Sequence, residues 1–374
     1  MMSQPYSASE IVVLKGLEAV RRRPGMYTDT QRPNHLAQEV IHNGALEAVE
    51  GHCTQIDVTL FGDGSLQVAD DGRGLPVEID PLANVSALEL ILTELYCPPP
   101  PRFGLAVVNA LSRRLDCWVR RGTEEYFISF RDGELHSKLT VTRSIDRHTT
   151  GTTLRFWPDP TFFDSGTFSV PDLQHTLRVK AALCPGLRVT FSNEATGKKD
   201  EWFFTDDLRT YLIERLGQSE RLPVEPITGG CHADSVVVDY ALNWALDGRA
   251  VVRESYVNLL PSRKGGTQVE ELLRAGVARA VRQFSEARGL VPHSIELAPE
   301  DVWEKASFVL SAKIQTEDLG GGLTDGRLAS SHAALVKSLA SDSMSRWLQL
   351  HPDAAERIAR LALATARERI RDGR

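Results

Sequence analysis

Residues 68–76, V-A-D-D-G-R-G-L-P, constrain what this chain can fold into more than any other segment. They join the end of a predicted buried strand to two carboxylates and two glycines, and glycine lets a backbone approach a flat ligand closely. A carboxylate at such a strand end, here Asp70, can accept a hydrogen bond from the exocyclic amine of a purine. An ordinary hairpin turn is the alternative, because Asp-Gly is a common turn dipeptide.

Upstream, residues 38–43, Q-E-V-I-H-N, place Glu39 and Asn43 on one face of a predicted helix. The amide oxygen of Asn43 suits a magnesium ion, and the carboxylate of Glu39 can take a proton from an attacking water. Taken alone, these two residues are better explained as part of a solvated helix face. Followed by a patterned strand and D-D-G-R-G, they predict a nucleotide site.

A third segment, T-G-T-T-L-R-F at 150–156, places a small hydroxyl beside a glycine at the start of a predicted strand. Thr152 can hydrogen-bond the same base or a bridging water. A β-branched residue in an ordinary strand is an equally good interpretation, because such residues favour strands.

Composition limits the setting and the partners. The 374 residues suffice for two domains, and a net charge of −7 argues against a generally basic nucleic-acid coat. The five cysteines show no metal-binding or disulfide spacing, so we expect a reducing, cytoplasmic environment. No apolar run approaches membrane-spanning length and no signal-peptide pattern is present, so no membrane partner is expected.

The remaining pattern predicts alternating helices and strands in two domains. Ile56, Val58 and Val68 alternate around G-D-G at 62–64, which predicts a hairpin. Asn34 is predicted to cap the helix that carries Glu39. The segment 217–230 is rich in proline, glycine and charge, and we take it as the domain boundary. Helices are expected near 10–23, 34–49, 86–96, 105–111, 269–288 and 354–371, and further strands near 118–121, 126–130, 135–141, 152–156, 236–242, 251–257 and 308–314.

Several runs, taken in this order, resemble the ATPase region of the type IIA DNA topoisomerase B subunits, the family of DNA gyrase B and topoisomerase IV. They are R-R-R-P-G-M-Y at 21–27, R-P-N-H-L at 32–36, V-V-N-A-L-S at 107–112, R-F-W-P-D at 155–159, F-F-D-S at 162–165, C-P-G at 184–186, E-S-Y-V-N-L at 254–259 and G-G-T at 265–267. The resemblance, nearer to topoisomerase IV, implies an α+β fold. A two-layer Bergerat (GHKL) ATP-binding domain at 1–217 would precede a ribosomal-protein-S5-like transducer domain at 218–374.

The resemblance also implies cofactors, site residues and partners. ATP and Mg²⁺ would bind with Glu39 as the general base, Asn43 as the metal ligand and Asp70 as the adenine reader. The positions implied to line the base pocket or its mouth are Arg73, Gly74, Pro76, Ile91, Thr152 and Arg121. Implied partners are a second copy of the chain, joined through an N-terminal arm containing Tyr6 and Ile11, together with DNA and an A-type cleavage subunit.

The first departure from the family pattern lies beside Glu39. The family usually reads E-V-I-D-N-S-x-D-E-A, whereas residues 39–48 read E-V-I-H-N-G-A-L-E-A. Two acidic residues have become His42 and Leu46, and leucine cannot hold a water. Glu47 is retained and is expected to perform part of that work at the nucleotide.

Two further departures concern the phosphates. The family's glycine-rich lid, which cradles the triphosphate with backbone amides, is replaced at 97–103 by C-P-P-P-P-R-F, and proline has no N–H to donate. Gly104 matches the last lid glycine, and Arg102 is the nearby cation. The Q-T-K loop, whose lysine reaches the γ-phosphate, aligns with L-T-D at 323–325, so that Asp325 replaces the lysine, and Lys313 matches a strand position. We therefore expect a retained base pocket and turnover near background unless another segment substitutes, because positioning and charge carry most of phosphoryl transfer.

Two origins and two functions remain open. An engineered lid deletion explains the short splice, whereas a natural drifting paralogue explains every departure at once. The chain is either the ATP-operated clamp of a topoisomerase or a binding and dimerisation protein without turnover. It ends about where a metal-binding domain would begin, so strand cleavage is not expected in it. Basic residues of the second domain could face DNA or lie on solvated helix faces, namely Arg263, Lys264, Arg274, Arg279 and Arg282. Other Bergerat-fold families would not be expected to carry R-R-R-P-G-M-Y or E-S-Y-V-N-L.

Overall fold

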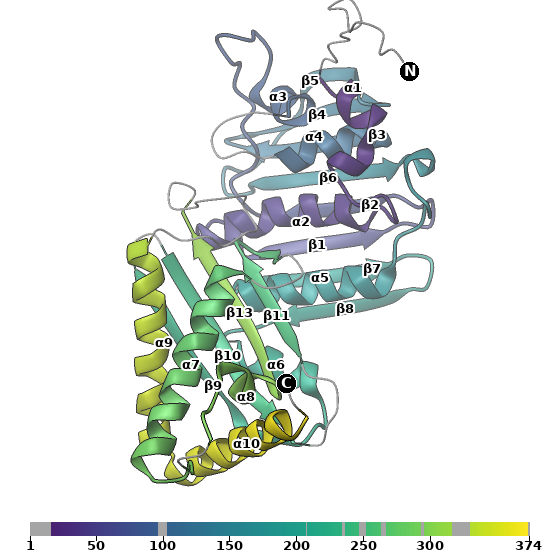
Figure 1. The fold of residues 1–374 in the computed structure, drawn as a ribbon. Helices are drawn as coiled ribbons and strands as arrows, with labels where there is room; N and C mark the ends of the chain where they lie inside the picture. Colours follow the sequence, from purple (N-terminus) through teal and green to yellow (C-terminus); the bar gives the residue numbers. More distant parts are fainter. Residues whose placement is uncertain are drawn as a thin grey trace, which may run out of the picture. The chain divides into compact units, whose positions relative to one another are not determined.

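The computed structural model describes residues 16–95, 103–206, 208–233, 236–246, 252–262, 267–292, 295–315 and 330–372. The chain forms two compact units, Met1–Phe203 and Phe204–Arg374, referred to below as unit 1 and unit 2 (Figure 1). Among the described residues, no helix is long and apolar enough to cross a bilayer.

Unit 1 is an eight-stranded sheet in the order β5-β4-β3-β6-β2-β1-β7-β8, with helices α2, α4 and α5 lying across one face (Figure 1). Its strands are β1 Gln55–Leu60, β2 Leu66–Asp70, β3 Ser112–Arg121, β4 Glu124–Arg131, β5 Glu134–Ser144, β6 Gly151–Pro158, β7 Arg188–Asn193 and β8 Lys198–Phe203. Its helices are α1 Glu18–Arg22, the short 3₁₀ helix η2 Pro24–Met26, α2 Asn34–Val49, α3 Ala87–Thr93, α4 Phe103–Ala110, the 3₁₀ helix η3 Pro160–Phe162 and α5 Val170–Leu183. This two-layer arrangement is the α+β class expected from the sequence.

The predicted hairpin and the helix before it bring the first two motifs together. Strands β1 and β2 pair antiparallel, with Ile56 opposite Asp70. Leu36 and Ile41 of α2 are fully buried, as are Ile56 and Val58 on the alternating face of β1. Helix α2 packs on this hairpin at Gly44, where a Cβ would lie 3.1 Å from Cδ1 of Ile56 and 3.3 Å from Cβ of Asp70.

The prediction that Asn34 caps α2 was wrong. Pro33 occupies the N-cap position, and Asn34 is the first helical residue. Its amide group instead exchanges two hydrogen bonds with the backbone of Ser169, each 2.8 Å long. Asn34 therefore ties α2 to the start of α5, a tertiary role that local capping rules do not predict.

Unit 2 is a five-stranded sheet in the order β12-β11-β13-β10-β9. Its strands are β9 Arg221–Ala233, β10 Val236–Ala245, β11 Arg253–Val257, β12 Leu260–Pro261 and β13 Ala306–Ile314, and its helices are α6 Arg209–Leu216, α7 Gln268–Ala287, α8 Pro299–Trp303, α9 Ser330–Leu350 and α10 Pro352–Arg371. The core joins this sheet to α7, α9 and α10, with residues such as Leu310, Val277, Met344 and Ile358 almost fully buried.

The segment 217–230, which we took from its composition as the domain boundary, lies inside unit 2. Most of it belongs to β9, which pairs antiparallel with β10. Pro223 and Pro226 are tolerated because β9 is an edge strand, where one side makes no ladder hydrogen bonds. The two units divide between Phe203 and Phe204, before α6, because Tyr211 and Arg215 of α6 bond Glu254 in unit 2.

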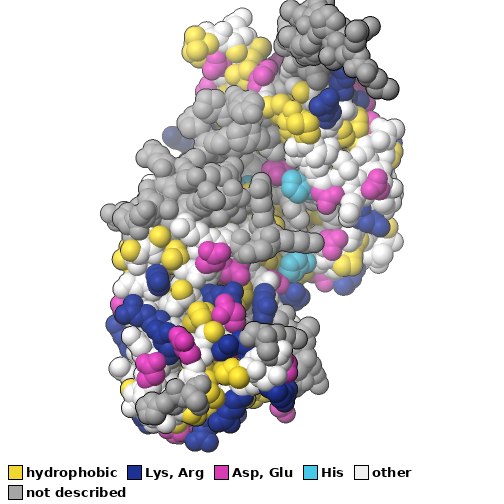
Figure 2. All heavy atoms as spheres, viewed as in Figure 1, with side chains coloured by type: hydrophobic (Ala, Val, Ile, Leu, Met, Phe, Trp, Pro, Cys, Tyr) yellow, Lys and Arg dark blue, Asp and Glu magenta, His cyan; other side chains and the backbone are white. Residues whose placement is uncertain are grey.

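Charged side chains on unit 2 are mixed in sign. Figure 2 shows Lys and Arg interspersed with Asp and Glu over the part that carries α7, α8 and α10. Two arginines of the suggested DNA-facing set lie in ion pairs, Arg274 with Glu300 at 2.6 Å and Arg282 with Glu286 at 3.9 Å. Arg279 is exposed, and Arg263 and Lys264 lie outside the described residues. The contacts favour solvated, paired helix faces for Arg274 and Arg282.

Candidate functional site

The centre of the candidate site is the carboxylate of Asp70 at the end of β2. Asp70 is 6% exposed, and its Oδ1 accepts hydrogen bonds from the backbone N–H groups of Gly72 (3.0 Å) and Thr152 (3.2 Å). Within the described part of the chain no hydrogen bond reaches Oδ2, so this oxygen can accept a proton donor from a ligand. Burial raises the pKa of Asp70 to about 6, although the two N–H donors lower it.

Glycines allow the backbone to close around this carboxylate. Gly74 has φ +78°, and a Cβ there would lie 2.6 Å from the carbonyl oxygen of Arg120. Gly151 has φ +133°, and a Cβ there would lie 2.0 Å from the carbonyl oxygen of Asp70. Both positions combine a left-handed backbone with close contact, so only glycine fits without a shift.

Thr152 connects Asp70 with the following loop. Its amide donates to Asp70, and its hydroxyl accepts from the N–H of Leu75 at 3.1 Å. The hydroxyl proton can then be directed to a second acceptor, such as a ring nitrogen of a base or a water. The local sequence left Thr152 open between strand and ligand roles, and in the structure it contacts both Asp70 and the loop.

The other residues predicted for the base pocket lie on several different elements. Arg121 donates to the carbonyl of Gly74 at 2.8 Å and approaches Glu78 at 3.3 Å. Pro76 is half-buried in the loop after β2, and Ile91 is buried on α3. Arg121 therefore closes one side of the loop that holds Gly74.

Arg73 forms a forked ion pair with α2. Its Nε and Nη2 each lie 2.9 Å from the carboxylate of Glu47, whose Oε2 also accepts from the Arg73 backbone N–H, and Nη2 further contacts Glu50. The Glu47 side chain is 9% exposed, whereas that of Arg73 is 47% exposed. The pair anchors the D-D-G-R-G turn to α2, a role that sequence spacing did not suggest for either residue.

Glu39 and Asn43 lie one turn apart on α2. Asn43 is buried, and the side chain of Glu39 is 23% exposed with His35 3.9 Å from its carboxylate. Burial raises the pKa of Glu39, while His35 and Lys180 lower it. A methyl group at Gly104, in the first turn of α4, would lie 1.9 Å from Oε2 of Glu39. The expected general base thus contacts the helix that follows the shortened lid.

The sequence analysis missed Lys180 of α5, which lies beside this face of α2. It is 3% exposed, and its Nζ lies 3.3 Å from Nδ1 of His42. Burial lowers the pKa of Lys180 to about 8, while Glu39 and Cys184 raise it. Its position in L-R-V-K-A-A-L, three residues after the buried Leu177, was a detectable signal, because that spacing turns it toward the core.

Comparison with known proteins identifies the family. A family model described as DNA gyrase B matches residues 204–374. The B subunit of DNA topoisomerase 4 from Pseudomonas aeruginosa is 46% identical over 99% of this chain, and the corresponding protein of Escherichia coli is 44% identical. A solved topoisomerase IV ATP-binding domain of Francisella tularensis, in complex with a small-molecule inhibitor, is 34% identical. It superposes with a TM-score of 0.81 over 96% of this chain and 99% of its own.

The chain belongs to the type IIA topoisomerase B-subunit family. The 43K ATPase domain of Thermus thermophilus gyrase B, solved with an aminocoumarin, also matches with a TM-score of 0.78 and 28% identity, covering 96% of this chain and 97% of its own. The resemblance and the fold class expected from the sequence are confirmed. The chain spans 60% of the length of these two topoisomerase 4 relatives.

Several positions of the family pattern lie outside the described residues. They are Tyr6 and Ile11 of the expected arm, residues 97–102 of the lid splice, and Leu323, Thr324 and Asp325 of the aligned loop. Lys313 lies on β13 opposite Val237, as its alignment to a strand predicted. Gly104, which matches the last lid glycine, lies within the described residues together with its contact to Glu39.

The face of α2 that carries Glu39 and Asn43 offers few possible metal ligands. Within the described residues no group of three or more His, Cys, Asp or Glu side chains could hold a metal. Magnesium commonly takes one or two protein ligands and completes its shell with phosphate oxygens and waters. Asn43, with Glu39 one turn away, therefore suits a magnesium ion that arrives with a phosphate-bearing ligand.

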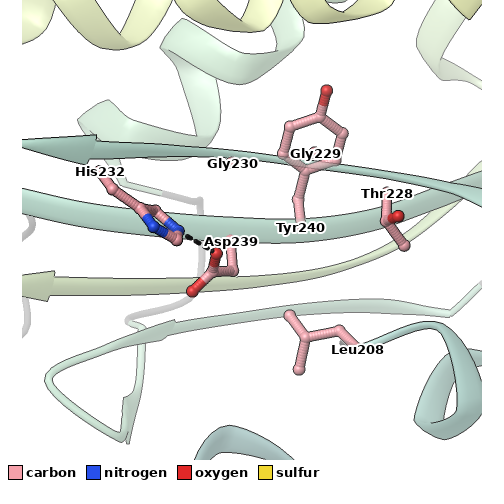
Figure 3. A pocket seen from close by; sticks show the side chains of 7 residues that line it. All are labelled: Leu208, Thr228, Gly229, Gly230, His232, Asp239 and Tyr240. Atoms are coloured by element: carbon pink, nitrogen blue, oxygen red, sulfur yellow. Dashed lines mark hydrogen bonds and ion pairs between the residues drawn. The ribbon is translucent and has the colours of Figure 1, made fainter. Parts of the chain in front are cut away.

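Unit 2 contains a separate cavity of about 300 Å³, lined by Leu208, Thr228, Gly229, Gly230, His232, Asp239 and Tyr240. Figure 3 shows His232 directed at Asp239, with the ring of Tyr240 on the other side of the strand. Nε2 of His232 lies 2.7 Å from Oδ1 of Asp239, so these two side chains are paired with each other. Because the titratable groups lining this cavity, His232 and Asp239, already bond each other, we place the candidate functional site at Asp70 instead.

Proposed function

We propose that unit 1 binds an adenine nucleotide at Asp70 and that the chain serves as the ATP-binding and transducer region of a topoisomerase IV-like B subunit. The observation that carries the proposal is the buried carboxylate of Asp70, which two backbone donors orient at Oδ1 while no hydrogen bond reaches Oδ2 among the described residues. A purine amine would donate to Oδ2, and the hydroxyl of Thr152 would meet the base or a bridging water. Gly74, Pro76, Ile91 and Arg121 would enclose the ring.

The phosphates would extend toward α2 and the start of α4. Asn43 would hold Mg²⁺ through its amide oxygen, and Glu39 would accept a proton from the attacking water. The ion would neutralise charge on the phosphates. Glu47, tied to Arg73, would keep the turn after β2 in place beneath the nucleotide.

The same contacts support binding more strongly than turnover. A triphosphate needs donors around it, whereas the segment joining α3 to α4 carries four consecutive prolines. Glu39 also packs against Gly104, at the helix start where phosphates would be expected. We therefore propose slow hydrolysis, with a nucleotide-binding protein without turnover as the second candidate. Clamp closure, dimerisation through unit 1, DNA and an A-type subunit are proposed from the family.

Binding is tested by calorimetry with ADP and Mg²⁺ on the wild type, Asp70→Asn and Asp71→Asn. Asp71 is the matched control, because its carboxylate is turned to the backbone N–H groups of Thr54 (2.7 Å) and Gln55 (2.9 Å). We expect Asp70→Asn to weaken binding by a factor on the order of 10 to 100 and Asp71→Asn to leave it within about threefold. Equal losses of ADP affinity in the two variants would contradict the proposed contact between Asp70 and the adenine.

Turnover is tested by phosphate release from ATP with and without linear DNA, comparing the wild type with Glu39→Ala. A wild-type rate above that of the variant supports the ATPase. Identical rates at saturating ATP, together with retained ADP affinity, support the binding protein without turnover.

A further inference from the structure

Arg120 contacts the backbone of Asp70. It lies on β3 next to Arg121, and its Nη2 donates to the backbone carbonyl oxygen of Asp70 at 3.1 Å. Its Nη1 donates to the hydroxyl of Thr153 at 3.3 Å. The guanidinium therefore joins the end of β2 to the start of β6, the two segments that present the Asp70 carboxylate and the Thr152 amide.

Gly151 makes this reach possible. A Cβ at position 151 would lie 2.8 Å from Nη2 of Arg120 and 2.0 Å from the carbonyl oxygen of Asp70. The glycine thus leaves the space through which the guanidinium approaches the Asp70 peptide. Any larger residue would separate the two groups, so the T-G-T-T segment serves Arg120 as well as the base pocket.

Arg120 brings a positive charge close to Asp70, whereas Glu47 brings a negative one. Glu47 on α2 raises the pKa of Asp70 and Arg120 on β3 lowers it. The thiols of Cys117 on β3 and Cys53 before β1 also lie near this carboxylate, and burial raises the pKa of both above their usual range. Among these four groups Arg120 is the single cation, and it favours the ionised carboxylate together with the backbone N–H groups of Thr152 and Gly72.

The remaining charges on the β2 turn are directed elsewhere. The carboxylate of Asp71 is bonded to Thr54 and Gln55, and the guanidinium of Arg73 is bonded to Glu47. From β6, Thr152 and Thr153 bring polar but uncharged side chains. Arg121 bonds the carbonyl of Gly74 at the other side of the loop.

We infer that Arg120 is a positioning residue for Asp70: it holds the Asp70 peptide through its carbonyl oxygen and, as a nearby cation, extends to lower pH the range in which the site accepts an adenine. This inference rests on the proposed adenine binding. The amine of adenine can donate only to an acceptor, and a protonated carboxyl group loses part of that capacity. Removal of the cation favours protonation and moves the acid limit of binding to higher pH.

The test is the affinity for adenosine and for ADP with Mg²⁺, measured by calorimetry between pH 5 and 8. The wild type is expected to lose affinity about tenfold per pH unit below the pKa of Asp70, near 6. In Arg120→Gln this loss of affinity is expected to begin at a pH higher by on the order of one unit. Its affinity at pH 8 is expected to stay within about threefold of the wild-type value. Adenosine isolates the base, because it carries no phosphate that itself titrates in this range.

Arg121→Gln is the matched variant, because it removes the neighbouring guanidinium of the same strand. Arg121 contacts the loop and not the Asp70 peptide, so we expect affinity to fall by the same factor at every pH. Arg120→Lys keeps the charge but cannot bond both the Asp70 carbonyl and the Thr153 hydroxyl. Its affinity is expected to fall at a pH between those of the wild type and Arg120→Gln. If Arg120→Gln does not fold, as judged by its melting curve at pH 8, Arg120→Lys carries the test.

The inference would be overturned if an Arg120 variant lost its affinity at the same pH as the wild type. That result differs from failure of the proposed function, in which the wild type itself would bind neither adenosine nor ADP at any pH. An upward shift in Arg121→Gln equal to that in Arg120→Gln would also overturn it, because the effect would then belong to general positive charge.

Discussion

The carboxylate of Glu39 and the backbone of Gly104 are in direct contact, so that a Cβ at position 104 would lie 1.9 Å from Oε2, 2.5 Å from Cδ and 2.7 Å from Cβ of Glu39. Gly104 lies in the first turn of α4, and an unpaired helix start favours a nearby carboxylate. The contact joins the proposed general base to the segment whose length departs most from the family pattern. It also makes Gly104 a position where side-chain size is tightly limited.

Gly104→Ala is expected to lower stability by about 1–3 kcal/mol, because the added methyl group forces α4 away from α2. Urea unfolding of the single variants and of the Glu39→Ala/Gly104→Ala double variant measures the coupling. Truncation of Glu39 removes two of the three close atoms, so the methyl group should cost less in that background. Additive effects would show that the contact is not limiting.

Arg73→Ala is expected to destabilise unit 1 by about 1–3 kcal/mol, because it leaves the nearly buried carboxylate of Glu47 without its forked partner. Arg188→Ala is the control, since the Arg188–Glu201 pair lies at the surface with both side chains about half exposed. That surface pair should contribute less than about 1 kcal/mol. Equal losses in urea unfolding would argue against a special role for the Glu47–Arg73 pair.

Lys180 should make the stability of unit 1 depend on pH in alkaline solution. Its pKa in the folded chain is lowered to about 8 from the usual 10.5, so between these values the unfolded chain binds more protons and stability rises with pH. The difference amounts to at most about 3 kcal/mol. Urea unfolding at pH 7, 8.5 and 10 should therefore give a steeper rise for the wild type than for Lys180→Met. Parallel curves for the two proteins would contradict a buried, titrating amine.

The hydroxyl of Tyr211 should contribute to the free energy of unfolding of unit 2. Its hydroxyl donates to Glu254 Oε2 at 2.7 Å, while Tyr256 donates to the same oxygen at 2.9 Å and Arg215 contacts Oε1 at 2.9 Å. Because the acceptor is charged and Tyr211 is 1% exposed, Tyr211→Phe is expected to cost about 1.5–3 kcal/mol. Tyr126→Phe removes a comparable bond to Glu124 at the surface and should cost far less. A double variant with Tyr256→Phe would measure how far the two hydroxyls act together.

Local sequence was sufficient for the elements that carry the nucleotide motifs. The alternation of Ile56, Val58 and Val68 around a G-D-G turn predicted the β1–β2 hairpin, because a strand with one buried face needs a period of two. The four-residue spacing of Glu39 and Asn43 predicted their shared helix face for the same kind of reason. Chemistry at a strand end then singled out Asp70, whose predicted adenine contact stays a prediction until binding is measured.

Contacts between distant segments were beyond that reasoning. Pro223 and Pro226 belong to the segment that we took as a domain boundary, yet an edge strand tolerates them, and only the sheet order places β9 at an edge. Asn34 resembled a cap but bonds Ser169, which lies 135 positions further along the chain. The ion pair of Arg73 with Glu47 depends on how α2 crosses the hairpin.

The sequence by itself determined the family, because its motifs have a fixed order and spacing, and the α+β class, which that resemblance implies. Only the tertiary structure decided that Arg120 bonds the backbone carbonyl of Asp70, that Lys180 lies buried beside His42, and that Glu39 contacts Gly104. The physical reason is that burial and charge act through space. A residue's environment is set by whichever segments pack against it, and these segments can lie anywhere in the chain.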